Sequence, residues 1–355
     1  MSVEQQQQHT IHLEIQNGDD SLKLVRRMKP PKINEWVRSA LSTVTRDGMA
    51  LRYESNDLQN NEQVVTAAVS QNVLALQYAS IDLKNNERVM TAAVTQNGHV
   101  LMYGSNEMVG NEKVVTAAVT QNGLSLQFAS DELRNNERVA IAAITQHADA
   151  WMYVSDKLKC NERVAMVAIT KCGRALMDVS DELKNDERFV TAAVTQYGPA
   201  LKYASTAMQN NEQIAIAAVK NRGRSLAYVS ERLQNNEQIV TFAVTDCGHA
   251  LQDASDELKN NKKVVTVAVT ENGRALIFAS DELKNNRDVV TAAITQGGWV
   301  FEYASDELKS DEQVVTTAVK FNGNALWCVP NEMKNNEQIV TIAVTQNGLA
   351  LRHAS

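Results

Sequence analysis

Histidines and cysteines are the residues of this sequence best suited to metal binding or nucleophilic chemistry, and they are scattered along it. The six histidines are His9, His12, His99, His147, His249 and His353. The four cysteines are Cys160, Cys172, Cys247 and Cys328. They form no Cys-x-x-Cys pair, so the spacing predicts neither a zinc site nor a disulfide framework. Separate thiols fit a reducing compartment such as the cytoplasm.

Catalytic motifs are also missing from the sequence. It holds no phosphate-binding loop, no dinucleotide fingerprint and no nucleophile elbow. An active site needs residues that occur once, held in a pocket by defined partners. We therefore expect no enzyme, no metal and no cofactor.

The dominant feature is a motif of 25 residues that recurs without insertion or deletion. Its twelve copies begin at residues 61, 86, 111, 136, 161, 186, 211, 236, 261, 286, 311 and 336, and the last is cut short at Ser355. Residues 34–60 hold a degenerate copy that we expect to cap the array. Residues 1–33 precede it and predict a flexible Gln-rich tail with a basic linker.

Numbered from its first residue, each copy predicts two helical segments. Positions 4, 5, 8 and 9 are apolar, which places them on one helix face between about positions 2 and 12. Asn or Asp at position 1 is a good N-cap. Gly at position 13, present in eleven of thirteen copies, predicts a left-handed helix stop. Position 8 is Ala in all twelve copies from residue 61, which indicates a close approach of two helices.

The second segment is apolar at positions 15, 16, 19 and 23. Ser occupies position 20 in twelve of thirteen copies. The pattern fits one continuous helix, and it equally fits a helix followed by a short turn that the serine caps. In both cases a single copy is too small to bury its apolar face, so stacking of the copies must create the core.

The predicted fold is therefore all-α: an α-solenoid, or superhelical array, of about thirteen αα-hairpin repeats. No stretch is apolar over the roughly 20 residues that a membrane span needs, so we expect a soluble protein. The sequence also allows self-association of the chain through the two ends of the stack.

Two sets of side chains stand out on the predicted surface. Position 3 is basic in five consecutive copies, a row that we call the position-3 ladder: Arg88, Lys113, Arg138, Arg163 and Arg188. Such a ladder could follow nucleic acid. Each member, however, comes directly after a Glu, and the chain has a net charge of −7, which favours a solvated, salt-bridged face.

The second set is apolar. Large side chains occupy position 17, where a polar residue is expected: Met102, Met152, Met177, Ile277 and Trp327. Trp299 at position 14 and the nearby Phe301 add to it. Exposed Met and Trp side chains are typical of protein-binding surfaces. Trp299 and Trp327 are the best candidates for the hot spot of such an interface.

The repeat, Asn-Asn-Glu-Arg-Val-x-Thr-Ala-Ala-Val-Thr-Gln-Asn-Gly followed by Leu-x-Leu-Gln-x-Ala-Ser-Asp-Glu-Leu-Lys-Asn-Asn, resembles the domain of unknown function numbered 4116. The resemblance covers residues 61–355. It implies an array of the kind found in effector-like proteins of Legionella-type intracellular bacteria, and hence action in the cytosol of a host cell, but it implies no catalytic residue.

From these observations we expect a noncatalytic scaffold that binds a protein of unknown identity. The alternative is a nucleic-acid-binding array that uses the position-3 ladder.

Overall fold

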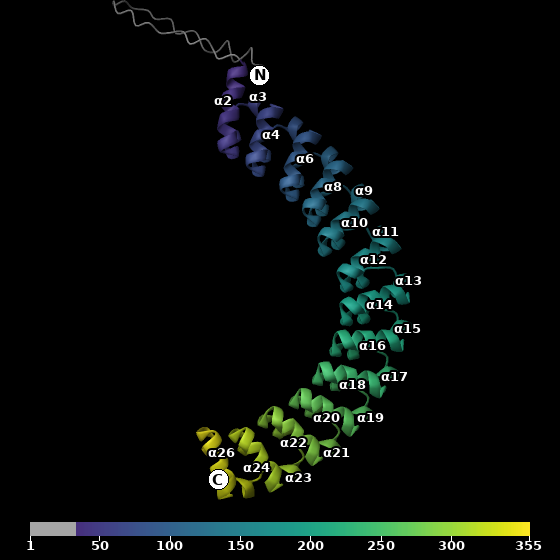
Figure 1. Cartoon of the computed structure of the whole chain (residues 1–355), viewed down its shortest axis with the longest axis vertical. Coiled ribbons are helices and arrows are strands. Elements are labelled where there is room, and N and C mark those ends of the chain that lie inside the picture. The colour runs from purple at the N-terminus through teal and green to yellow at the C-terminus, as the bar shows by residue number, and fades with distance from the viewer. Residues whose placement is uncertain (1–32) are drawn as a thin grey trace, which may run out of the picture. The chain divides into compact units, whose positions relative to one another are not determined.

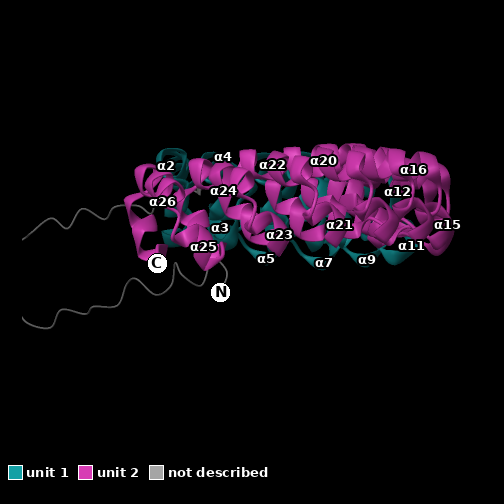
Figure 2. Ribbon diagram, turned by 90° about the horizontal axis from the view of Figure 1, so that it is seen from below, with its two compact units in different colours: residues 1–158 teal, residues 159–355 magenta. Residues whose placement is uncertain are grey.

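The computed structural model describes residues 33–355. The expected Gln-rich tail and basic linker lie outside the described residues. Contacts divide the chain after Leu158, within helix α11, into unit 1 and unit 2, which are coloured separately in Figure 2. Residues 33–355 contain helices and turns and no β-strand, so the fold is an all-α repeat array.

Each repeat contains three helical elements. A long α-helix occupies positions 2–11, a 3-10 helix positions 13–18, and a four-residue α-helix positions 21–24. The second of the two interpretations of positions 14–25 is therefore the correct one. The reason is local, because the serine at position 20 has an extended backbone and therefore separates the 3-10 helix from the short helix. Its side chain then caps the short helix, as Ser80 does by accepting from the N–H of Leu83.

The long helices are α2 (Ile33–Arg46), α4 (Glu62–Gln71), α6 (Glu87–Gln96), α8 (Glu112–Gln121), α10 (Glu137–Gln146), α12 (Glu162–Lys171), α14 (Glu187–Gln196), α16 (Glu212–Asn221), α18 (Glu237–Asp246), α20 (Lys262–Glu271), α22 (Arg287–Gln296), α24 (Glu312–Phe321) and α26 (Glu337–Gln346). The 3-10 helices are η1 (Gly48–Tyr53), η2 (Val73–Tyr78), η3 (Gly98–Tyr103), η4 (Gly123–Phe128), η5 (Ala148–Tyr153), η6 (Gly173–Met177), η7 (Gly198–Tyr203), η8 (Gly223–Tyr228), η9 (Gly248–Asp253), η10 (Gly273–Phe278), η11 (Gly298–Tyr303), η12 (Gly323–Cys328) and η13 (Gly348–His353). The short helices are α3 (Asn56–Gln59), α5 (Ile81–Lys84), α7 (Asn106–Val109), α9 (Asp131–Arg134), α11 (Asp156–Lys159), α13 (Asp181–Lys184), α15 (Thr206–Gln209), α17 (Glu231–Gln234), α19 (Asp256–Lys259), α21 (Asp281–Lys284), α23 (Asp306–Lys309) and α25 (Asn331–Lys334).

Within each unit, successive repeats stack side by side (Figure 1). The short helices follow one another along one edge of the unit. The turns between the long and the 3-10 helices follow one another along the opposite edge, which we call the turn edge. The core between the edges is built from the predicted apolar positions, for example Val64, Val65, Ala68 and Leu76, which are fully buried.

The glycine of position 13 has a different role from the one predicted. None of the described glycines at this position has a left-handed φ. Instead, a Cβ atom on Gly223 would lie 2.2 Å from the carbonyl oxygen of Ala243, the invariant alanine of the next repeat. The glycine therefore permits a close approach between neighbouring repeats and does not serve as a left-handed stop.

The side chain at position 11 joins neighbouring repeats through hydrogen bonds that the sequence analysis missed. The amide of Gln121 accepts a bond of 2.7 Å from the backbone N–H of Gly98 and donates one of 3.2 Å to the carbonyl of Gln96. It thereby satisfies a carbonyl at the end of the preceding long helix, which has no partner within its own helix.

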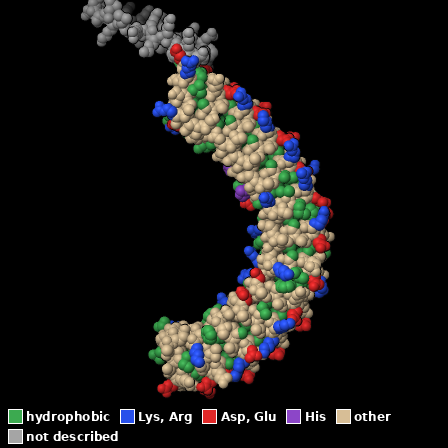
Figure 3. Space-filling view, viewed as in Figure 1, with side chains coloured by type: hydrophobic (Ala, Val, Ile, Leu, Met, Phe, Trp, Pro, Cys, Tyr) green, Lys and Arg blue, Asp and Glu red, His purple; other side chains and the backbone are tan. Residues whose placement is uncertain are grey.

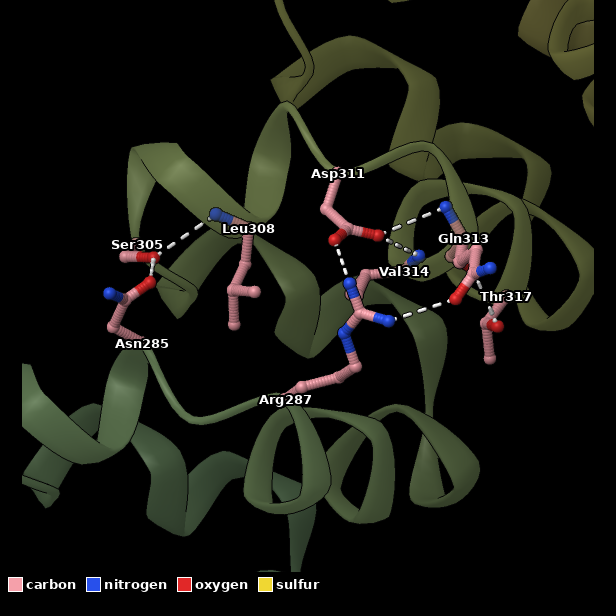
Figure 4. A network of polar contacts seen from close by, with 8 residues as sticks. All are labelled: Asn285, Arg287, Ser305, Leu308, Asp311, Gln313, Val314 and Thr317. Carbon is pink, nitrogen blue, oxygen red and sulfur yellow. Dashed lines mark hydrogen bonds and ion pairs between the residues drawn. The ribbon is translucent and has the colours of Figure 1, made fainter.

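A second set of bonds joins the repeats near the short helices (Figure 4). The hydroxyl of Ser305 donates to Asn285 of the preceding repeat over 2.6 Å and accepts from the N–H of Leu308 over 3.2 Å. Arg287 forms an ion pair with Asp311, which caps α24 by accepting from the N–H groups of Gln313 and Val314. Where both sets of bonds occur, neighbouring repeats are joined on both edges.

No helix among residues 33–355 is both long enough and apolar enough to cross a membrane.

Candidate interaction surfaces

The position-3 ladder is largely neutralised by ion pairs with position 2 of the preceding repeat. Arg88 lies 3.1 Å from Glu62, Lys113 lies 2.6 Å from Glu87, and Arg138 lies 3.9 Å from Glu112. Arg188 lies 3.4 Å from Glu162 in the same manner, and it also pairs with Asp186. Arg163 is exposed in the same row. The partner is the Glu one repeat earlier, since stacking brings positions 2 and 3 of neighbouring repeats together.

The same pairing occurs once with reversed sign, in a later repeat. Position 2 is basic at Lys262 and Arg287. Lys262 lies 2.6 Å from Asp288, which occupies position 3 of the next repeat. The ion pair holds the pKa of the Asp288 carboxyl below its usual value, because the hydrogen bond from Lys262 favours the charged form. The row is therefore a set of exposed ion pairs in either orientation.

Positions 14 and 17 lie one turn apart on the 3-10 helices and face solvent. The apolar side chains predicted at position 17 are all exposed: Met102, Met152, Met177, Ile277 and Trp327, with exposed fractions between 43% and 64%. Trp299 at position 14 is 40% exposed. The buried positions next to them in the 3-10 helices are nearly uniform. Within these helices the repeats therefore differ most at the exposed positions 14 and 17, which we call the exposed row.

Phe301 is a correction to the predicted set. It occupies position 16, is completely buried, and replaces the leucine found there in most repeats. A 3-10 helix has three residues per turn, so position 16 shares the buried face with positions 13 and 19, whereas positions 14 and 17 point outward. Phe301 therefore belongs to the core, as Trp151 does at the same position.

Trp299 and Trp327 lie in different surroundings. The guanidinium of Arg274 covers the Trp299 ring at 4.9 Å from its centroid, and Tyr303 contacts that ring edge to face at 6.4 Å. Trp327 is half exposed on η12. Trp299 is thus already held in place by its neighbours, which lowers the entropy cost of using it in an interface.

The histidines and cysteines of the described chain form no metal site. Among residues 33–355, no three His, Cys, Asp or Glu side chains are grouped so that they could hold an ion. His99 packs edge to face on Phe128, and His249 on Phe278, with centroids 5.6 and 5.8 Å apart. These histidines therefore take part in packing between repeats. His9 and His12 lie outside the described residues.

The comparisons with known proteins agree with the repeat structure. The model of the domain of unknown function DUF4116 matches residues 40–84, 72–109, 111–159, 161–209, 211–259, 236–280, 261–309 and 311–355. The chain belongs to the DUF4116 family. The longer DUF4116 matches each span two of the 25-residue repeats. Curated proteins gave no match, and neither did solved structures.

Proposed function

We propose that this chain is a noncatalytic scaffold that binds a protein through the exposed row of positions 14 and 17. The observation that carries the proposal is the contrast between a uniform buried frame and a variable exposed row with large apolar side chains. Met and Trp side chains in such places are typical of protein interfaces. In unit 2, Trp299 is already packed against Arg274 and Tyr303, which lowers the entropy cost of ordering it in an interface.

Binding of nucleic acid along the position-3 ladder is the alternative, and it has less support. Four of the five cations form ion pairs with Glu side chains of the neighbouring repeat. A polyanion would have to displace these carboxylates before it could release counterions of its own.

Action inside a host cell is a further part of the proposal. It is supported by the resemblance of the repeat to arrays in effector-like bacterial proteins, and by thiols that form no disulfide among the described residues. The partner would then be a protein of the host cytosol, so a eukaryotic lysate is the appropriate source.

Affinity capture from such a lysate, read by mass spectrometry, tests the proposal. The double variant Trp299→Ala with Trp327→Ala is expected to lose the captured protein. Ile81→Ala, which removes an even more exposed apolar side chain from the short-helix edge, is the control and should keep it. Equal capture by all three proteins would contradict the proposal.

A further inference from the structure

The turn edge of unit 2 carries a cluster of cations that the ladder does not include. Five exposed basic side chains lie at positions 10 to 14 of the repeats that begin at residues 161 and 211, on either side of the repeat that carries Tyr197. We call them the turn-edge cluster: Lys171, Arg174, Lys220, Arg222 and Arg224. Within unit 2 none of them forms a salt bridge, whereas the basic side chains at the start of the long helices do, namely Arg188, Lys262, Lys263 and Arg287. Their positive charge is therefore available to a ligand.

Aromatic rings contact Arg174, Lys220 and Arg222 without neutralising their charge. The guanidinium groups of Arg174 and Arg222 lie 5.9 and 5.5 Å from the centroid of the Tyr197 ring. The ammonium of Lys220 lies 4.4 Å from the Phe242 ring. A ring orients the cation through its quadrupole but carries no net charge, so the N–H groups at the rim of each guanidinium remain free to donate.

Stacking brings the cluster together from distant parts of the sequence. The N–H of Gly173 donates to Gln196 over 3.0 Å, and the N–H of Gly198 donates to Asn221 over 2.6 Å. These bonds align the turns that begin η6, η7 and η8. Neighbouring helices lie about 8 to 10 Å apart, so the cluster extends over roughly 20 Å. Figure 3 shows Lys and Arg side chains along the turn edge, opposite the edge of the short helices.

Acidic side chains limit how far the positive charge extends along the turn edge. In the next repeat, burial is the main cause of the lowered pKa of His249, and the positive charges of Arg224 and Arg274 add to it. Asp246 lies against this side of the cluster, because its carboxylate accepts a hydrogen bond of 2.7 Å from the N–H of Gly223, between Arg222 and Arg224. Glu271 occupies the same position in the next repeat and is exposed on the same edge. Their carboxylates would repel a polyanion that continued along the edge, so the ligand must be short.

We propose that the turn-edge cluster binds a short acidic peptide segment of the protein partner. The inference rests on the proposed function and names the chemistry of the partner. A peptide of five to seven extended residues has the required length of about 20 Å, and its carboxylates match the bidentate geometry of the arginines. Single-stranded nucleic acid fits less well, because it needs uncovered rings for its bases, whereas two guanidiniums already occupy Tyr197.

Fluorescence anisotropy with a labelled peptide of alternating Glu and Ser tests this proposal on the full chain. The same peptide with Gln in place of Glu is the control ligand, and an oligothymidylate of equal length is the competing class. We expect the Glu peptide to bind more tightly than both, and we expect added salt to weaken it.

The double variant Arg222→Glu with Arg224→Glu is expected to weaken binding of the Glu peptide by about tenfold or more, since several exposed charge contacts are lost at once. Lys262→Glu with Lys263→Glu makes the same change in net charge at two ion-paired lysines of the same unit, away from the turn edge, and it should alter the affinity by less than about twofold. Circular dichroism checks that both variants keep their helices.

Three results would overturn the proposal: equal binding of the Glu and Gln peptides, an unchanged affinity in the Arg222/Arg224 variant, or tighter binding of the oligothymidylate through the same arginines. A failure here is distinct from failure of the proposed function. Loss of lysate capture in the Trp299/Trp327 variant would still support a scaffold even if the acidic peptide did not bind.

Discussion

At the scale of single residues, the most restrictive position is the glycine of position 13. In ten repeats, from Gly48 to Gly323, a Cβ atom here would lie 2.2 to 2.8 Å from the carbonyl oxygen of the alanine at position 8 of the next repeat. Gly348, in the last repeat, has nothing within 4 Å. In these ten repeats the contact with the next repeat, and not the local backbone angle, therefore disfavours a side chain, although Val73 and Ala148 show that two other repeats accommodate one.

This difference predicts opposite outcomes for the same substitution. Gly223→Ala should lower the free energy of unfolding by about 1 to 3 kcal/mol, because the new methyl group overlaps the Ala243 carbonyl. Gly348→Ala should leave it unchanged or raise it by up to about 1 kcal/mol. Urea denaturation followed by circular dichroism measures both. An equal loss of unfolding free energy in the two variants would show that the backbone conformation at the glycine, and not the contact with the next repeat, causes the destabilisation.

Cys328 allows a test of burial through pH. Burial raises the pKa of its thiol to about 11. At pH 8 only about one thiol in a thousand is then ionised, so iodoacetamide should modify Cys328 slowly and about tenfold faster for each unit of pH up to 11. The exposed Cys160 should react first in peptide mapping by mass spectrometry. Rapid modification of Cys328 at pH 8 in the folded protein, matching its rate in urea, would contradict this burial.

At the scale of elements, the second half of each repeat is divided by a polar residue. Ser at position 20 has an extended backbone, caps the short helix and bonds to the preceding repeat, as Ser280 does with Leu283 and Asn260. Serine at position 15 is different: Ser125 and Ser225 are completely buried within 3-10 helices, and their hydroxyl groups have no hydrogen-bond partner. The two kinds of serine therefore affect stability with opposite sign.

Alanine substitution separates them. Ser280→Ala should lower the thermal midpoint, with a loss of about 1 kcal/mol, because α21 loses its N-cap. Ser225→Ala should raise the midpoint, with a gain of about 1 kcal/mol, because a buried hydroxyl without a partner is removed. Scanning calorimetry on both variants measures the two shifts. A destabilised Ser225→Ala protein would mean that this hydroxyl has a partner, such as a buried water.

At the scale of the whole molecule, each repeat is fixed mainly to its neighbours. The bonds at positions 11, 13, 20 and 25 all join consecutive repeats, for example Gly323 to Gln346 and Ser305 to Asn285. Stability in such an array is close to a sum of repeat and interface contributions. The chain should therefore tolerate the loss of whole repeats.

Removal of residues 311–355 tests this modularity. The shortened chain should keep helical circular dichroism in proportion to its length. It should unfold at a lower temperature, because the last two repeats and the two interfaces that they make are lost. Deletion of residues 211–260, which joins Asn210 to Asn261 and keeps the repeat in register, is the control and should behave similarly. Complete loss of helicity in the first protein would refute the modular description.

The linear sequence is sufficient to predict the repeat length, the all-α array, the start of each long helix and the apolar core positions. These follow from contacts between residues three or four apart, which a linear pattern records directly. The N-caps at positions 1 and 20 are of the same kind, since Asn61 and Ser80 bond to N–H groups two or three residues later.

The contacts between repeats became known from the three-dimensional structure. It showed why position 13 is glycine, how Gln121 bridges two helices, that Phe301 is buried while Trp299 is exposed, and that Arg174 and Arg222 meet at Tyr197. These partners are 20 to 27 residues apart or depend on the three-residue turn of a 3-10 helix. The stacking of one repeat on the next places them together, and a pattern within a single repeat does not contain that geometry.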